Sequence, residues 1–143
     1  MTISTASAFW DGGLKSGNGQ FEAKSGAFKG AYTFSTRFES AAGTNPEELL
    51  AAAHAACVSM ALAGDLEGSG HSPTRISTTA SATMEKVADG VKITRMRLVV
   101  RGQVPGIDQA TFATAAEAAK NGCPVSNAFK GNIEVDLEAT LES

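Results

Sequence analysis

The feature that most constrains the fold is a segment after Asn45 that is built largely from leucine and alanine. Asn45 can serve as an N-cap, Pro46 suits the first helical position and Glu48 falls at the third, so a helix is predicted to begin here. Gly64 and Gly68 indicate where it ends. Because small and apolar residues lie nearly all round this helix, it is predicted to be buried on most of its faces.

Strands are predicted on both sides of the helix. Glycine turns separate short aromatic segments in the first 40 residues, the last of which, 32–38, is rich in β-formers. Asp89-Gly90 is a hairpin signal between strands predicted over 75–87 and 91–104. Apolar and polar residues alternate over 133–141, which predicts a final strand with one apolar face.

A second helix is predicted from Asp108, as its N-cap, to Gly122, as the glycine that follows its C-terminus. Cys123 then occupies the cap position of a short third helix, with Pro124 at its first position. These elements predict an α+β fold in which antiparallel strands pack on a buried helix. With 143 residues, the chain is expected to form one domain over 1–143.

Charge and hydropathy exclude several classes of function. The formal net charge of −3 is spread along the chain, which gives no reason to expect a nucleic-acid or membrane partner. The first five residues lack the basic and apolar regions of a signal peptide, and the apolar run 49–64 is shorter than the roughly 20 residues of a membrane span. A cytoplasmic protein is therefore expected, in which a cysteine pair is more often catalytic, redox-sensing or metal-binding than permanently bridged.

The two cysteines, Cys57 and Cys123, are the candidates for chemistry. Cys57 lies in the apolar helix, where burial raises the pKa of a thiol and disfavours the reactive thiolate. A reactive Cys57 therefore needs a cation; Arg37 is the candidate, and Glu47 can fix its guanidinium plane by a bidentate contact. Cys123 has its own activator, because a helix N-terminus favours a thiolate. The residues alone do not decide which thiol attacks first.

Each of these residues also has a simpler interpretation. Cys57 could be a small buried hydrophobe, Arg37 a surface residue and Glu47 a carboxylate that only favours the helix dipole. His54 lies on roughly the same helix face as Cys57, which makes it a candidate base or metal ligand. Since His71 is the only other histidine and no further cysteine exists, a zinc site is not expected. We expect His54 to pack structurally or to line a pocket.

Together, several segments resemble the OsmC branch of the OsmC/Ohr family, the osmotically inducible and organic-hydroperoxide-resistance proteins. These segments are Arg37, Asn45–Leu49, His54–Cys57, Val104–Asp108 and Gly122–Ser126. The resemblance runs over nearly the whole chain. It places the family's peroxidatic cysteine at Cys57 and its resolving cysteine at Cys123. It also places the family's arginine and glutamate at Arg37 and Glu47.

The resemblance implies a thiol peroxidase that reduces organic hydroperoxides to alcohols without a cofactor or metal. Cys57 would become a sulfenic acid and condense with Cys123 to a disulfide, which an external dithiol of the lipoyl type would reduce. The implied fold is OsmC-like, with antiparallel strands around a long buried central helix. The implied assembly is an intertwined homodimer with active sites at its interface.

Two other classes of function stay open. One is a hydrolase that uses Cys57 and His54, although it lacks an evident oxyanion element and an orienting third group. The other is a non-catalytic redox-sensing or small-ligand-binding protein.

Glu47 and Cys57 are ten residues apart on one helix, so their Cα atoms should be about 15 Å apart along its axis. We therefore predict composite sites in which a second copy supplies Glu47, with Arg37 supplied either in cis or in trans.

Overall fold

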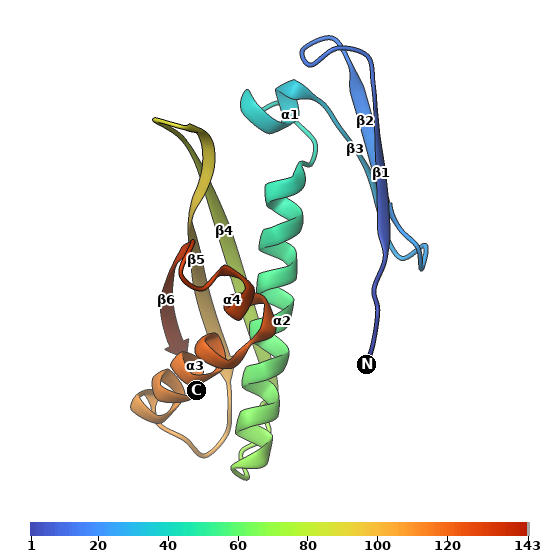
Figure 1. The fold of residues 1–143 in the computed structure, drawn as a ribbon. Helices are drawn as coiled ribbons and strands as arrows, with labels where there is room; N and C mark the ends of the chain where they lie inside the picture. The colour runs from blue at the N-terminus through green and yellow to red at the C-terminus, as the bar shows by residue number, and fades with distance from the viewer. Residues whose placement is uncertain (143) are drawn as a thin grey trace. The chain divides into compact units, whose positions relative to one another are not determined.

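The computed structural model describes residues 1–142 and divides the chain into two compact units. The N-terminal unit is Met1–Leu49, and the C-terminal unit begins at Leu50. Each unit contains one three-stranded sheet (Figure 1). The single domain over 1–143 stays a prediction.

The sheet of the N-terminal unit is antiparallel and has three strands: β1 (Ala6–Asp11), β2 (Asn18–Ala23) and β3 (Lys29–Tyr32). Aromatic rings pack across it, with ring centroids 5.3 Å apart for Trp10 and Tyr32 and 5.8 Å apart for Phe21 and Tyr32. Gly19 lies beneath two of these rings, and an added Cβ would come within 2.8 Å of both Trp10 and Tyr32. Glycine at this position therefore allows the rings to cover the strand. The strands predicted before residue 33 are confirmed.

The strand predicted over 32–38 is wrong after Tyr32, because Phe34–Phe38 form helix α1. The Thr33 hydroxyl accepts the Thr36 N–H at 3.2 Å, and the Thr36 hydroxyl accepts the Thr33 N–H at 2.9 Å. This reciprocal capping box satisfies two backbone donors within one turn. The local hydrogen bonds outweigh the β preference of the segment.

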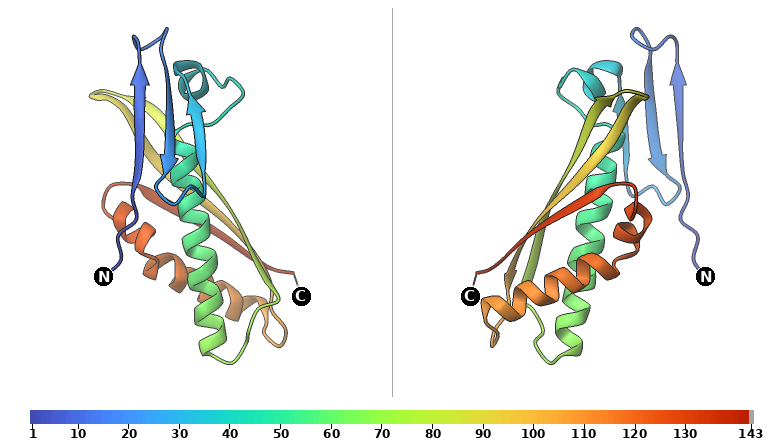
Figure 2. Two further views of the ribbon diagram at one scale, coloured as in Figure 1. Left: turned by 90° about the vertical axis from the view of Figure 1, so that its right-hand side faces the viewer. Right: turned by 60° about the vertical axis from the view of Figure 1, so that its left-hand side comes forward.

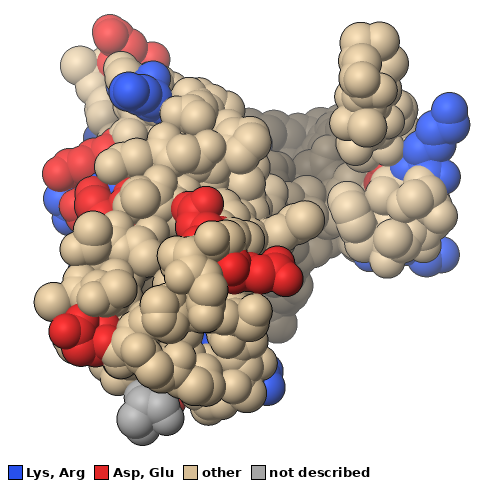
Figure 3. All heavy atoms as spheres, turned by 90° about the horizontal axis from the view of Figure 1, so that it is seen from below, with Lys and Arg blue, Asp and Glu red and all other residues tan. Residues whose placement is uncertain are grey.

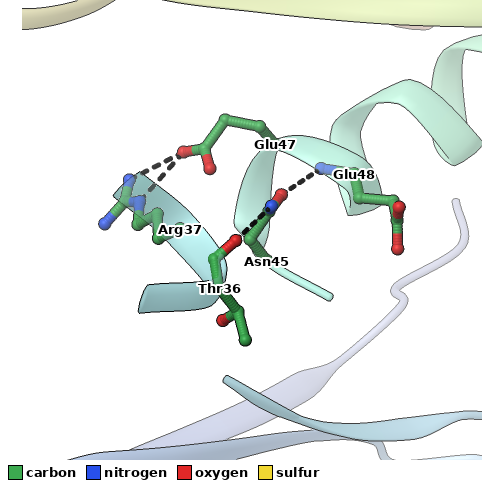
Figure 4. A network of polar contacts seen from close by, with 5 residues as sticks. All are labelled: Thr36, Arg37, Asn45, Glu47 and Glu48. Carbon is green, nitrogen blue, oxygen red and sulfur yellow. Dashed lines mark hydrogen bonds and ion pairs between the residues drawn. The ribbon is translucent and has the colours of Figure 1, made fainter. Parts of the chain in front are cut away.

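Helix α2 (Pro46–Gly68) begins where the sequence predicts. The Asn45 Oδ1 atom accepts the Glu48 N–H at 2.8 Å, as an N-cap does. The Asn45 side-chain amide also donates to the Thr36 carbonyl at 3.0 Å (Figure 4). One side chain thus starts α2 and ties its first turn to α1.

Only one face of α2 is buried in the single chain, which is less than predicted. The buried face repeats every four residues: His54, Val58, Leu62 and Leu66. The exposed residues are mostly small or apolar: Ala52, Ala53, Ala56, Met60 and Gly64. α2 has 23 residues, and an 18-residue stretch of it has a mean hydropathy of 1.6. A helix of this length and hydropathy could cross a membrane, but the core helices of soluble proteins reach the same values. The helix ends at Gly68, one of its two predicted ends, and is therefore longer than the apolar run 49–64 that was compared with a membrane span.

The sheet of the C-terminal unit has three strands: β4 (Arg75–Val87), β5 (Gly90–Gln103) and β6 (Glu134–Leu141). β4 and β5 form the predicted antiparallel hairpin, with Val87 opposite Gly90. β6 instead runs parallel to β5, so the prediction of antiparallel strands is wrong for this pair (Figure 2). Two helices lie between these strands in the chain, and such a crossover returns the chain in the original direction.

The two crossover helices are α3 (Gln109–Gly122) and α4 (Pro124–Phe129). Asp108 is the predicted N-cap of α3, and its carboxylate accepts the Thr111 N–H at 2.8 Å. Gly122 is the last residue of α3 instead of the residue after it, which corrects that prediction. Cys123 caps α3 at its C-terminus and α4 at its N-terminus, so one residue makes the corner between them.

α2 and α3 contribute to one core with the inner face of the β4–β6 sheet (Figure 1). The buried members of this core are Val58, Leu62, Leu66, Leu98, Val100, Val104, Phe112, Ala116, Ala119 and Cys123. Phe112 lies against Gly102, where any added Cβ would overlap its ring. The close approach of α3 to β5 therefore depends on glycine at position 102.

Charged side chains line the outer face of β5 and β6. Arg95 pairs with Asp136 at 3.0 Å, and Arg97 pairs with Glu138 at 2.7 Å. These groups are exposed, so each pair contributes little to stability. On the face shown in Figure 3, acidic side chains are dispersed among uncharged ones.

Candidate active site

The fold of the C-terminal unit brings the two cysteines together. The Sγ atoms of Cys57 and Cys123 are 2.7 Å apart, and both residues are free thiols. A disulfide places its sulfur atoms about 2.0 Å apart, so a small movement would join them. Since 65 residues lie between the two cysteines in the sequence, the crossover through α3 creates this pair.

Cys123 is fully buried at the N-cap of α4. Its Sγ atom accepts the Ser126 N–H at 3.4 Å. Burial acts to raise the pKa of the Cys123 thiol, but its hydrogen bonds with the Cys57 thiol and with Ser126 outweigh it, and the net pKa is lowered. The direction agrees with the predicted effect of a helix N-terminus on this thiol.

Cys57 is half-buried and has the opposite shift. Burial raises the pKa of the Cys57 thiol, and its hydrogen bond with Cys123 raises the pKa further. The raised pKa expected from the position in the apolar helix is confirmed. Within the C-terminal unit, a single negative charge is therefore more stable on the Cys123 sulfur than on the Cys57 sulfur. Cys57 needs a further cation to act as the first nucleophile, which is the role predicted for Arg37.

His54 is fully buried and contacts Ser126, with 2.7 Å between His54 Nε2 and Ser126 Oγ. Its ring also packs edge-on against Phe129, with centroids 5.2 Å apart. Burial lowers the pKa of His54, which favours the neutral imidazole. The expectation that His54 packs structurally is confirmed.

The contacts of His54 weigh against the hydrolase alternative. Its Nε2 atom faces Ser126 and not Cys57, so the base–nucleophile hydrogen bond of a Cys–His pair is lacking. Its Nδ1 atom is buried without a hydrogen-bond partner among residues 1–142, so no acid orients the ring. The sequence analysis gave Ser126 no role. The available signal was its position three residues after the N-cap Cys123, where a backbone N–H meets the capping side chain.

Arg37 and Glu47 form an ion pair in the N-terminal unit (Figure 4). The Arg37 Nε and Nη2 atoms donate to the same carboxylate oxygen, Glu47 Oε1, at 3.1 and 2.8 Å. The predicted bidentate contact is therefore wrong in detail, because Oε2 is not engaged. Oε2 is buried and has no hydrogen-bond partner in the described part of the chain. The Glu47 side chain is 8% exposed and that of Arg37 is 38% exposed.

The four predicted residues thus form two pairs, one in each unit. The action of Arg37 on Cys57 stays a prediction. Over residues 1–142, no group of three or more His, Cys, Asp or Glu side chains is arranged to hold a metal ion.

Comparison with known proteins assigns the chain to a family. The model of the OsmC-like protein family matches residues 39–138, which include Glu47, Cys57 and Cys123 and begin just after Arg37. The chain is 46% identical over 140 residues to the peroxiredoxin OsmC of Escherichia coli, covering 96% of this chain and 98% of that one. It is 38% identical over 96 residues to an organic hydroperoxide resistance protein of Xanthomonas axonopodis pv. citri, covering 66% of each chain.

Solved structures agree with this assignment. The organic hydroperoxide resistance protein OsmC of Legionella pneumophila has a TM-score of 0.77 at 26% identity, with 100% of both chains covered. OhrB of Bacillus subtilis has a TM-score of 0.75 at 28% identity, with 94% of this chain and 97% of that chain covered. The resemblance stated from the sequence is confirmed, and this chain belongs to the OsmC-like protein family.

Proposed function

We propose that this protein is a cysteine-based peroxidase that reduces organic hydroperoxides to alcohols. The contact between Cys57 and Cys123 carries the proposal, because it places two free thiols where one can resolve the oxidised form of the other. The names of the relatives, peroxiredoxin OsmC and organic hydroperoxide resistance protein, support the same chemistry.

The reaction has two steps at the cysteines. The Cys57 thiolate attacks the distal peroxide oxygen, the O–O bond breaks, and the alcohol leaves after taking a proton. Cys57 is then a sulfenic acid. The Cys123 sulfur, as a thiolate, attacks the Cys57 sulfur; an S–S bond forms, the S–O bond breaks, and the hydroxyl group leaves as water with the proton that Cys123 released.

Exposure supports Cys57 as the first nucleophile. Cys57 is half-buried, whereas Cys123 is fully buried, so a hydroperoxide reaches Cys57 more readily. The lowered pKa of Cys123 fits the second step, in which a thiolate attacks the sulfenic sulfur. The raised pKa of Cys57 then requires Arg37, and Arg37 also stabilises charge that develops on the peroxide oxygens.

The exposed face of α2 supports a homodimer. In the apolar 18-residue stretch of α2, only 22% of the residues are buried in the single chain. Ala52, Ala56 and Gly64 repeat at intervals of four or eight residues on this face, and small residues allow two helices to approach closely. The unpartnered Glu47 Oε2 is consistent with a further donor outside this chain.

In such a dimer, the Arg37–Glu47 ion pair requires that the same chain supplies both residues to a given site. Because they bind each other within one chain, a copy that supplies Glu47 to its partner's Cys57 also supplies Arg37. Mixing Glu47→Ala and Cys57→Ser proteins tests this arrangement. If the pair acts in trans, each mixed dimer has one intact site and regains activity. Activity no higher than that of the parent variants, with subunit exchange verified, contradicts it.

We place the protein in the cytoplasm as a soluble enzyme that is regenerated by a lipoyl-type dithiol. Turnover with cumene hydroperoxide should be supported better by dihydrolipoamide than by thioredoxin or glutathione. Cys57→Ser should abolish peroxide consumption, whereas Cys123→Ser should allow one reduction per chain. The reverse pattern would exchange the roles of the two thiols. A single equivalent of peroxide consumed by the wild-type protein in excess dithiol would favour a redox sensor.

A further inference from the structure

The contact between the two cysteines has a parallel neighbour, a second polar contact between side chains of α2 and the start of α4. His54 and Cys57 are three residues apart on α2, so they lie on one helix face. Cys123 and Ser126 are also three residues apart, at the cap and in the first turn of α4. Cys57 contacts Cys123 at 2.7 Å, and His54 contacts Ser126 at 2.7 Å. A hydrogen bond that connects the same two elements, α2 and the start of α4, therefore lies next to the thiol pair.

Ser126 connects this hydrogen bond to the Cys123 sulfur. Its side chain binds His54, while its backbone N–H donates to Cys123 Sγ at 3.4 Å. When His54 fixes the Ser126 hydroxyl, it therefore also fixes the Ser126 N–H, which orients the Cys123 sulfur. Both His54 and Ser126 are buried, so water does not readily replace their hydrogen bond.

α4 depends on such contacts for its position. It has six residues, and a helix this short is not stable by itself in water. Its other buried residue, Phe129, packs on the His54 ring. His54 thus contacts α4 both near its start, through Ser126, and at its end.

We propose that His54 and Ser126 are positioning residues for disulfide formation. Their hydrogen bond holds the first turn of α4 against α2, so that Cys123 stays within reach while Cys57 is a sulfenic acid. The inference rests on the proposed peroxidase function and concerns its second step. A sulfenic acid that waits for its partner is open to a second peroxide, which converts it to sulfinic acid. The same hydrogen bond therefore protects Cys57 from over-oxidation.

Substitutions that remove the hydrogen bond with little change in shape test the proposal. Ser126→Ala removes the hydroxyl but keeps the backbone N–H, and His54→Phe keeps a ring of similar size. Ser126→Thr and His54→Gln are the matched controls, because each retains a group that can form the bond. Each reduced protein is mixed with one equivalent of cumene hydroperoxide. Peroxide loss and disulfide formation are then followed separately by rapid quenching and mass spectrometry.

We expect disulfide formation to slow by about three- to tenfold in Ser126→Ala and His54→Phe, the effect of losing one hydrogen bond. Peroxide loss should keep the wild-type rate, and the sulfinic fraction should rise when peroxide is in excess. The control variants should restore the rate of disulfide formation. Wild-type disulfide formation in both Ser126→Ala and His54→Phe, or equal slowing of both steps, would overturn the inference. If the wild-type protein itself forms no disulfide with peroxide, the proposed function fails instead.

Discussion

Replacing Arg37 by methionine should destabilise the protein through Glu47. The structure gives Glu47 two hydrogen bonds, both from Arg37 to Oε1, and none to the buried Oε2. Arg37→Met therefore leaves a nearly buried carboxylate without its cation. Breaking a fully buried ion pair costs about 3–5 kcal/mol. Because the Arg37 side chain is 38% exposed, water replaces part of the interaction, and we expect a loss of about 2–3 kcal/mol.

Urea unfolding of three variants, at one protein concentration, measures this loss. Glu47→Gln should cost about 1 kcal/mol or less, since its amide oxygen still accepts from Arg37. The double variant Arg37→Met/Glu47→Gln should be more stable than Arg37→Met, because it contains no unpaired buried charge. The double-mutant cycle should show a coupling of about 1–2 kcal/mol. The melting temperature of Arg37→Met should fall by about 4 °C for each kcal/mol lost.

The same variants separate stability from chemistry. Arg37 is predicted to lower the pKa of Cys57, so both variants that lack it should show a higher thiolate pKa in absorbance titrations. The double variant should recover stability without recovering the thiolate. If Arg37→Met unfolds within about 0.5 kcal/mol of the wild type, Glu47 has another partner and the reasoning is refuted. An unchanged thiolate titration would remove Arg37 from the activation of Cys57.

Three further predictions concern His54, Gly102 and the substrate. Burial lowers the pKa of His54 below its unfolded value of 6.5, so the unfolded chain binds the proton more readily. Stability should therefore fall as the pH drops below about 6.5, and His54→Gln should reduce this slope in urea midpoints. Gly102→Ala should cost about 1–3 kcal/mol, because the new methyl group overlaps the Phe112 ring, and Phe112→Leu should relieve part of the loss. Cumene hydroperoxide should have a higher kcat/KM than hydrogen peroxide, because Cys57 lies in a helix rich in leucine and alanine, and each substrate methylene buried against such side chains adds about 0.8 kcal/mol; equal values would contradict apolar surroundings at Cys57.

Local hydrogen bonds explain which elements the sequence predicts well. The starts of α2 and α3 are marked by Asn45 and Asp108, and each side chain accepts a backbone N–H three residues later. α1 shows the limit of propensity, because the capping box of Thr33 and Thr36 makes a helix from a segment rich in β-formers. The spacing of Thr33 and Thr36, three residues apart, was the feature that indicated a helix start, but the β-forming residues around it favoured a strand.

Long-range geometry explains what the sequence left open. Nothing local distinguishes a parallel from an antiparallel β6, because its alternating pattern fits either direction. The composition of α2 predicted burial on most faces, but the single chain covers only the face with His54, Val58 and Leu62. How many faces are covered depends on the neighbouring elements and on other chains, and composition does not encode these.

By itself, the sequence determined the starts of α2, α3 and α4, the hairpin at Asp89-Gly90, the family and the four residues on which the chemistry was placed. Each of these depends on side chains close together in the chain or on motifs at fixed spacing. The family resemblance predicted that Cys57 pairs with Cys123, but only the tertiary structure shows how closely the two sulfurs lie, that His54 meets Ser126, and that Arg37 binds one oxygen of Glu47. The first two contacts join residues 66 and 72 positions apart. Such contacts exist because the α3–α4 crossover packs against α2. The residues next to each contact partner in the sequence do not predict that packing.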